Sequence, residues 1–192
     1  STWNCKGATF LSIEKQNETY KSFSEALPIK NYARKNLGYL KAISEGAKVI
    51  FDTDDDNLPY EFWDYDKNSE LNKISIIGDS FSNIYKFYTN KEKLIWPRGL
   101  PLDKIFCSSN LGKAVNVNTP IRQNLADLDP DVDAIYRLIF KKSTSFNKLN
   151  HNLVPNNNIF VPFNSQNTYF DKEFFILLYL PSHVPFRMCD IW

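Results

Sequence analysis

The chain has 192 residues, of which 43% are hydrophobic and 23% charged, and its formal net charge is +1. This is the composition of a globular protein that is long enough to bury a core. The near-neutral charge argues against nucleic acid as a partner. The chain has no apolar run of about 18 residues, so no membrane span is predicted.

The first half of the chain predicts a strand, a loop, a helix and a second strand. ATFLSI (residues 8–13) alternates as a strand does, and SEALPIKN (residues 24–31) is typical of a loop. Asn31 is a suitable N-cap and Gly46 a suitable helix stop. Between them, apolar residues recur at spacings of three and four, in a stripe made of Ala33, Leu37, Leu40 and Ile43 or Ala47.

KVIFD (residues 48–52) follows directly and predicts a short buried strand. Helix, glycine and buried strand in this order are typical of a layered α/β domain. ISIIG (residues 74–78) predicts another strand, and a helix is expected after the turn at Asp129 and Pro130.

The last quarter predicts a strand, a polar elbow and a helix. The asparagine-rich residues 150–158 are expected to form a loop. NNNIFVPFNSQNTYF (residues 156–170) indicates a strand and then an elbow, and DKEFFILLYLP (residues 171–181) a helix that ends before Pro181. FFILLYL (residues 174–180) is too short to span a membrane and is expected to be buried.

The most unusual segment is KVIFDTDDDNLP, in which Asp52, Asp54, Asp55 and Asp56 crowd four carboxylates into five residues. Carboxylates two positions apart on an extended segment point the same way. Hard oxygen ligands favour Mg²⁺ or Mn²⁺, which also hold substrate phosphates. The pattern therefore indicates a divalent metal at the carboxyl end of a strand, where ligands gather in open α/β sheets.

The acidic run has three other interpretations. An EF-hand is rejected because Asn57 stands where the loop needs glycine and Trp63 where it needs glutamate. An aspartyl-nucleophile phosphatase, with Asp52 attacking a phosphoryl group, is a minor alternative. IIGDS (residues 76–80) resembles the second acidic motif of such enzymes, but it follows the first motif too closely. A solvated turn is the common explanation of an acidic run.

Several segments, in matching order along nearly the whole chain, resemble the STELLO family of glycosyltransferase-like proteins, and more distantly the reversibly glycosylated polypeptides that act as UDP-arabinopyranose mutases. The segments are TWNCKGATFLSIEKQ (2–16), LPIKNYARKNLGYLKAISEGAKVIFDTDDD (27–56), WPRGLPL (96–102), DPDVDAIYRL (129–138), VPFNSQNT (161–168) and CDIW (189–192).

The resemblance implies a single GT-A-like domain over residues 1–192, with a layered mixed sheet flanked by helices. Relatives have a strand and loop before the segment that matches TWNCKG, so we expect the first family strand to be lacking and the chain to be a piece of a longer one. It further implies the Golgi or secretory pathway for an anchored eukaryotic relative.

The resemblance implies a glycosyltransferase that uses a nucleotide-diphosphate sugar, in the first instance a UDP-sugar, with Mn²⁺ or Mg²⁺ on the diphosphate. The acceptor, a glycan, a protein or a small molecule, is left open. A non-catalytic glycosyltransferase-like binding module is the alternative function.

Roles carry over to individual positions in the same way. Asp54 and Asp56 would hold the metal, with Asp55 beside them, and Asp190 would be the base that activates the acceptor. The other implied substrate-binding residues are Arg34 and Lys35 at the helix start, Trp96 and Arg98, Asp131 and Asp133, and Asn164 and Asn167 in the elbow. Several have a structural alternative: a helix N-cap for Asp190, a solvated helix face for Arg34 and Lys35, and a turn with a core tryptophan for Trp96 and Arg98. Helix capping explains at least one of Asp129, Asp131 and Asp133.

Overall fold

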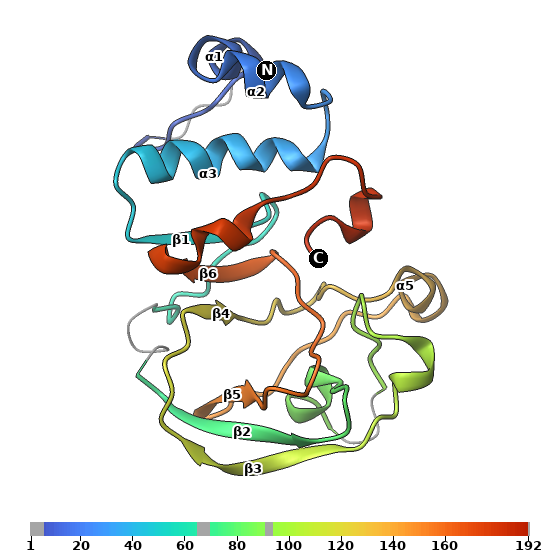
Figure 1. The fold of residues 1–192 in the computed structure, drawn as a ribbon. Helices are drawn as coiled ribbons and strands as arrows, with labels where there is room; N and C mark the ends of the chain where they lie inside the picture. The colour runs from blue at the N-terminus through green and yellow to red at the C-terminus, as the bar shows by residue number, and fades with distance from the viewer. Residues whose placement is uncertain (1–5, 65–69, 91–93, 192) are drawn as a thin grey trace. The chain divides into compact units, whose positions relative to one another are not determined.

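A computed structural model describes residues 6–64, 70–90 and 94–191 (Figure 1). It has two compact units. Unit 1 comprises Ser1–Ile50, Phe170–Asp190 and Trp192, and unit 2 comprises Phe51–Tyr169 and Ile191. The fold is mixed α/β, as expected, with two small sheets and short helices. Among the described residues, none of the helices combines the length and the apolar character that a membrane crossing requires.

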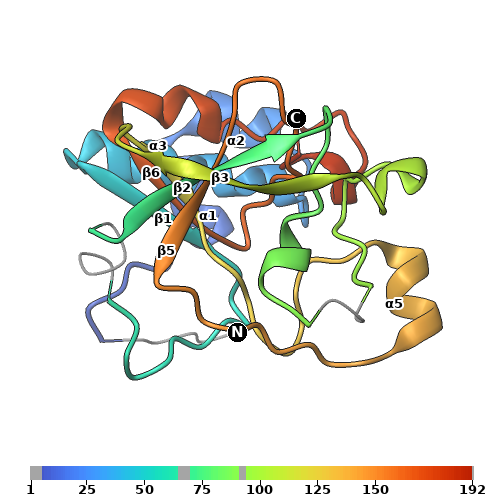
Figure 2. The ribbon, with the colours of Figure 1, turned by 90° about the horizontal axis from the view of Figure 1, so that it is seen from below.

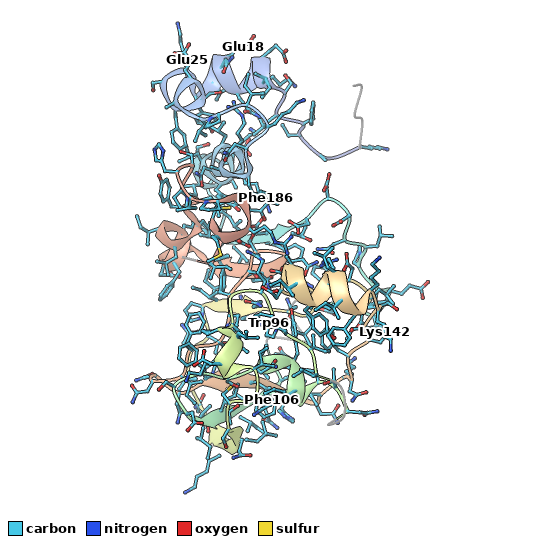
Figure 3. All side chains as sticks on the ribbon, turned by 90° about the vertical axis from the view of Figure 1, so that its right-hand side faces the viewer. Glu18, Glu25, Trp96, Phe106, Lys142 and Phe186 are labelled. Carbon is cyan, nitrogen blue, oxygen red and sulfur yellow. The ribbon has the colours of Figure 1, made fainter. Side chains whose placement is uncertain are left out.

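Unit 1 begins with two short helices, α1 (Ile13–Thr19) and α2 (Lys21–Ala26). The strand predicted over residues 8–13 is therefore wrong. The reason is local: the Ser12 hydroxyl accepts a hydrogen bond from the Lys15 backbone N–H at 3.3 Å, which starts α1 at the next residue. The loop predicted over residues 24–31 begins only at Leu27, because α2 extends to Ala26. Glu18 and Glu25 mark the two helices in Figure 3.

The next helix is confirmed, as a 3₁₀ turn η1 (Tyr32–Arg34) that continues into α3 (Lys35–Ser44). The Asn31 side chain accepts from the Ala33 N–H at 2.9 Å, and Gly46 has a φ of 81°. The apolar stripe is only partly correct. Ala33 and Leu37 are fully buried, but Leu40 and Ile43 are 39% and 41% exposed. Asn36 and Tyr39 are buried instead, so the buried face of α3 is rotated from the predicted one.

The chain leaves α3 into β1 (Val49–Thr53), within one residue of the predicted strand. The helix predicted over residues 171–181 is a 3₁₀ helix, η4 (Lys172–Leu178), and η5 (Phe186–Met188) follows. The expected burial of residues 174–180 is wrong for most of the segment. Ile176 is 83% exposed, and of the seven residues only Leu178 and Leu180 are buried.

Unit 2 contains a three-stranded sheet in the order β3-β2-β5 (Figure 1). The central strand β2 (Asn72–Gly78) contains the predicted ISIIG strand and pairs antiparallel with β3 (Ser109–Val115). On its other side β2 pairs parallel with β5 (His151–Pro155), in the register Asn72 to His151 through Ile76 to Pro155. The loop prediction for residues 150–158 is wrong there, because pairing with β2 makes a strand of an asparagine-rich segment.

A second sheet has the order β1-β6-β4, with β4 (Ile121–Gln123) and β6 (Asn167–Asp171). The strand predicted ahead of the elbow is wrong: that segment has only an isolated bridge between Phe160 and Phe81, and the strand β6 begins in the elbow, at Asn167. The predicted helix after Pro130 is confirmed as α5 (Ala134–Phe140), and Figure 2 shows it apart from the β3-β2-β5 sheet. Two short 3₁₀ turns, η2 (Ile84–Phe87) and η3 (Leu102–Lys104), lie between β2 and β3 in sequence. Tyr85, Ile95 and Val132 form a buried cluster in unit 2.

Candidate functional site

The acidic loop begins where β1 ends. Asp52 lies within the strand and is 4% exposed, while Asp55 and Asp56 occupy a turn and are exposed. Asn57 fixes the loop from its far side, because its Nδ2 donates to Thr53 Oγ1 at 3.0 Å and to the Gln166 carbonyl oxygen at 2.7 Å. The Asn57 backbone N–H closes the turn on the Asp54 carbonyl oxygen at 3.3 Å. The strand end thus presents two carboxylates to solvent on a braced turn.

The chemistry of this loop suits a hard divalent cation that takes few ligands from the protein. Carboxylate oxygens are the ligands that Mg²⁺ and Mn²⁺ prefer, and Mg²⁺ commonly keeps one or two of them alongside water and phosphate oxygens. Within the described ranges, no group of three or more histidine, cysteine, aspartate or glutamate side chains is arranged to hold a metal by itself. A cation at Asp54 and Asp56 would take its remaining ligands from water or from phosphate oxygens.

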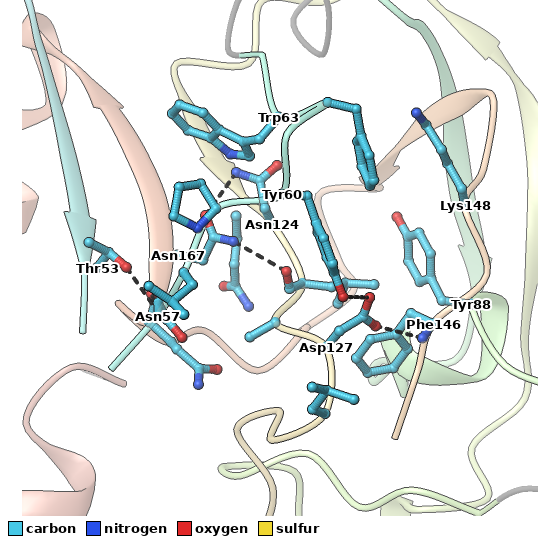
Figure 4. A pocket seen from close by; sticks show the side chains of 18 of the residues that line it. Thr53, Asn57, Tyr60, Trp63, Tyr88, Asn124, Asp127, Phe146, Lys148 and Asn167 are labelled. Atoms are coloured by element: carbon cyan, nitrogen blue, oxygen red, sulfur yellow. Dashed lines mark hydrogen bonds between the residues drawn. The ribbon is translucent and has the colours of Figure 1, made fainter. Parts of the chain in front are cut away.

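A cavity of about 760 Å³ in unit 2 opens beside this loop (Figure 4). Two of the implied site residues line it, Asp56 from the loop and Asn167 from β6. Most of the other lining residues lie within residues 57–63, 123–129 and 146–152, and the rest are Phe51, Thr53, Leu71, Tyr88 and Gln166. The fold therefore brings the end of the acidic run to a concave surface that is large enough for a small organic ligand.

Aromatic rings dominate one side of the cavity. Phe51 and Trp63 line it with ring centroids 5.5 Å apart, and Phe51 stacks at 4.4 Å on Tyr169, which is buried and outside the lining. Tyr60 and Phe62 form a second, nearly parallel pair. Aromatic faces of this kind accept bases, sugar rings or cations.

Asp127 holds one of these rings in place. Its carboxylate accepts a hydrogen bond from the Tyr60 hydroxyl at 2.9 Å and another from the Phe146 N–H at 2.7 Å (Figure 4). The bond to Asp127 raises the pKa of the Tyr60 phenol, because the neutral phenol donates to the carboxylate and the phenolate would be repelled by it. Tyr60 therefore remains a neutral donor at physiological pH.

The two asparagines of the elbow have different positions. Asn164 is 8% exposed and orders the elbow itself: its side-chain oxygen accepts from the Gln166 N–H and its carbonyl oxygen from the Thr168 hydroxyl. Asn167 reaches the cavity, where its Nδ2 donates to the Leu125 carbonyl oxygen at 3.2 Å and its Oδ1 accepts from Asn124 at 3.3 Å. One of the pair thus shapes the elbow and the other lines the cavity.

The structure brings WPRG and DPDVD together, although they are distant in sequence. The Arg98 guanidinium forms a bidentate ion pair with Asp131, with Nε 2.8 Å from both carboxylate oxygens and side chains only 11% and 14% exposed. Trp96 (labelled in Figure 3) donates from Nε1 to the Leu100 carbonyl oxygen at 2.6 Å. Asp133 caps α5 by accepting from the Ile135 N–H, which confirms that one aspartate of this segment is a helix cap. None of these four residues lines the cavity.

The remaining implied residues belong to unit 1. The Arg34 guanidinium donates four hydrogen bonds, to Gln16 Oε1, to the Ser24 hydroxyl and to the carbonyl oxygens of Ser24 and Leu27. Lys35 Nζ lies 3.1 Å from the Tyr32 hydroxyl and 4.7 Å from the centre of its ring. Asp190 is 8% exposed. Arg34 thus has a structural role, holding the end of α2 against α1.

Comparison with known proteins yields two plant relatives. The probable glycosyltransferase STELLO2 of Arabidopsis thaliana is 30% identical over 212 aligned positions, which cover 98% of this chain and 27% of the relative. The probable glycosyltransferase STELLO1 of the same plant is 28% identical over 209 positions, with the same coverage. This confirms the resemblance to the STELLO-type glycosyltransferase-like family. No family model matches the chain, which spans about a quarter of the length of these relatives.

In this STELLO-like chain, reasoning from sequence missed most of the cavity. Tyr60, Phe62 and Trp63 stand in a stretch without periodicity, and Asp127 and Lys148 come from unrelated segments. One signal was present: three aromatic side chains follow within seven residues of the last aspartate of the acidic run. Large aromatics clustered next to a candidate ligand loop are better candidates for a binding surface than for the core.

Proposed function

We propose that the chain provides the donor-binding part of a glycosyltransferase that uses a nucleotide-diphosphate sugar, in the first instance a UDP-sugar, with Mn²⁺ or Mg²⁺. One observation carries the proposal: the acidic run ends β1 on a braced turn, and its last carboxylate, Asp56, enters a cavity of about 760 Å³ walled by aromatic rings. The similarity to proteins named probable glycosyltransferases supports the reaction class.

The residues of this chain have distinct tasks in the proposed reaction. Asp54 and Asp56 would hold the cation, which supplies positive charge against the departing diphosphate. Asn57 would keep the carboxylates in position through its bonds to Thr53 and the Gln166 carbonyl oxygen. Asp190 remains the proposed base for the acceptor hydroxyl.

The phosphatase alternative has less support. A nucleophilic Asp52 would have to be reached by a phosphoryl group, but this residue is 4% exposed within β1 and does not line the cavity. The non-catalytic module differs from the enzyme only in turnover, so an assay must separate them.

The test is calorimetric titration of the whole chain with UDP in the presence of Mn²⁺, and again with a chelator. Asp54→Asn and Asp56→Asn should each weaken metal-dependent UDP binding by at least about tenfold, since each removes a charged ligand. Asp103→Asn is the matched control, because Asp103 is an exposed aspartate of unit 2 that does not line the cavity. Unchanged UDP binding by both loop variants would refute the proposal.

A UDP-sugar hydrolysis assay then decides between the enzyme and the module. Turnover that requires Mn²⁺ and is lost in Asp56→Asn supports the transferase. Metal-dependent binding with no turnover supports the binding module.

A further inference from the structure

The cavity has an exposed aromatic surface that the proposed metal and diphosphate do not require. Tyr60 and Phe62 stack with centroids 5.0 Å apart and an interplanar angle of 9°, and they are 50% and 66% exposed. We refer to this pair as the aromatic plate. Because the two rings stack face to face and Lys148 lies over the Phe62 ring, the Tyr60 ring, backed by Phe62, offers the face of negative potential against which the C–H face of a sugar ring can pack.

The plate is held in place before any ligand arrives. The Tyr60 hydroxyl donates to Asp127, whose other oxygen accepts from the Phe146 N–H. Lys148 Nζ lies 4.8 Å from the centre of the Phe62 ring. A surface whose rotamers are already fixed loses little conformational entropy on binding, which is a property of binding sites.

The cavity wall beside the plate offers hydrogen-bond acceptors. Three amide side chains brace the wall through their NH₂ groups. Asn57 donates to Thr53 and to the Gln166 carbonyl oxygen. Asn124 donates to Asn167, and Gln166 donates to the Asp129 carbonyl oxygen. Within the described part of the chain, their side-chain oxygens have no hydrogen-bond partner, and neither has the Asp56 carboxylate. Such a set matches a ligand rich in hydroxyl donors.

The charge of the lining disfavours an anionic ligand at the plate. The described lining residues include three aspartates, Asp56, Asp127 and Asp129, and one lysine, Lys148. Arg137 pairs with Asp129, which leaves the carboxylates of Asp56 and Asp127 against Lys148. An anion on the plate would have to approach these carboxylates, whereas a neutral polyhydroxyl compound would not be repelled.

We propose that the cavity binds a neutral carbohydrate, with one sugar ring packed on the Tyr60 ring, which Phe62 backs, and its hydroxyl groups donating to the side-chain oxygens of Asn57, Asn124 and Gln166. The inference rests on the proposed function in one respect: it identifies this carbohydrate as the acceptor, lying next to the sugar nucleotide at Asp56. The aromatic plate then favours a glycan as the acceptor, and the carboxylates of the cavity lining favour an uncharged one.

The experiment uses the whole chain without nucleotide or metal. Saturation-transfer NMR is recorded with cellohexaose, mannohexaose and maltohexaose as neutral probes and with hexagalacturonate as the anionic probe. At least one neutral probe should bind, and hexagalacturonate should bind at least about tenfold more weakly at low ionic strength. The double variant Tyr60→Ala with Phe62→Ala should lose at least about tenfold in affinity for the neutral probe.

Two further variants make the result specific. Tyr60→Phe keeps the ring and should retain most of the binding, while Phe106→Ala removes a phenylalanine of unit 2 that is 82% exposed and outside the cavity (Figure 3), and should change nothing. Absence of transfer from every neutral probe, equal binding of the anion, or indifference to the double variant each overturns the inference. If UDP binding fails while plate-dependent glycan binding persists, the proposed function falls and the glycan site stands; the reverse result refutes only the glycan site.

Discussion

The Asn36 side chain pairs with the backbone of Leu180 on both sides of its amide. Nδ2 donates to the Leu180 carbonyl oxygen at 2.8 Å, and Oδ1 accepts from the Leu180 N–H at 2.9 Å. The two residues are 144 positions apart, and both are buried. A single side chain on α3 therefore satisfies both backbone groups of a residue that has no strand partner.

Asn36→Ala should lower the free energy of unfolding by about 2–4 kcal/mol, because it removes two hydrogen bonds and leaves a buried N–H and C=O unsatisfied. Ser44→Ala, at the exposed end of the same helix, should have little effect. Urea unfolding of both variants measures the difference. Equal stability of the two would mean that water replaces the lost amide.

Arg98 and Asp131 should behave as a buried ion pair. Arg98→Met leaves the Asp131 carboxylate without its partner in a largely buried place, and should cost about 3–5 kcal/mol of unfolding free energy. Lys104→Met breaks an exposed pair with Asp103 and should cost less than about 1 kcal/mol. If nucleotide binding falls in Arg98→Met while thermal unfolding is unchanged, the substrate role implied by the resemblance is the better account.

Arg34→Lys separates a structural from a phosphate-binding role. Lysine keeps the charge but cannot reproduce the fork that joins Gln16, Ser24 and Leu27, so unfolding free energy should fall by about 1–3 kcal/mol. Metal-dependent UDP binding of the folded protein should be unaffected. Weaker UDP binding at unchanged stability would instead support the phosphate role. Lys15→Ala, on exposed α1, serves as the control.

Burial of two tyrosines makes the fold sensitive to alkali. Burial raises the pKa of Tyr88 to about 12, and burial followed by the Asp131 charge raises that of Tyr85 further. Above the ordinary value of 10.0 the unfolded chain loses these protons first, so the folded state binds more protons than the unfolded one. The contribution of these two tyrosines to the unfolding free energy is fully present below pH 10. It is lost as pH rises, by up to about 1.4 kcal/mol per pH unit for each tyrosine. Urea unfolding from pH 9 upward should show this decline, and Tyr88→Phe should reduce its slope; a flat profile would contradict it.

Gly78 and Gly38 should respond oppositely to a methyl group. At Gly78 φ is 140°, and an added Cβ would clash with the carbonyl oxygen of Ser108, the residue before the paired strand β3. Gly78→Ala should therefore destabilise unit 2. Gly38 lies within α3 with open space around it, so Gly38→Ala should stabilise by about 0.5–1 kcal/mol. Thermal unfolding of the two variants checks both signs.

The elements that could be predicted are those whose own residues encode them. Asn31 and Gly46 bound the third helix, Asp133 caps α5, and the apolar runs of β1 and β2 are bracketed by breakers. β5 was missed because its residues favour loops and only its pairing with β2 makes it a strand. Residues 174–180 were expected in the core, yet hydrophobicity alone does not say which side of a 3₁₀ turn faces the solvent.

The candidate site likewise has a part that is encoded locally and a part that depends on distant contacts. The acidic run could be located from the sequence, since a strand followed by spaced carboxylates is a local pattern. The cavity could not, because Tyr60 meets Asp127 across 67 positions and Asn57 meets Gln166 across 109. The Arg98–Asp131 pair joins two segments that the resemblance implied as separate substrate contacts. The metal, the nucleotide and the implied roles of Asp54, Asp56 and Asp190 stay predictions.

The two segments of unit 1 are separated in sequence by unit 2, so they are synthesised at different times. Unit 1 is discontinuous: residues 1–50 leave the ribosome first, and residues 170–190, which include Leu180, leave only after all of residues 51–169. Asn36 therefore waits for its partner while the residues of unit 2 are already available to fold. A nascent chain arrested before Leu180 would carry unit 2 with its cavity, and a unit 1 still exposing the α3 face that Leu180 closes.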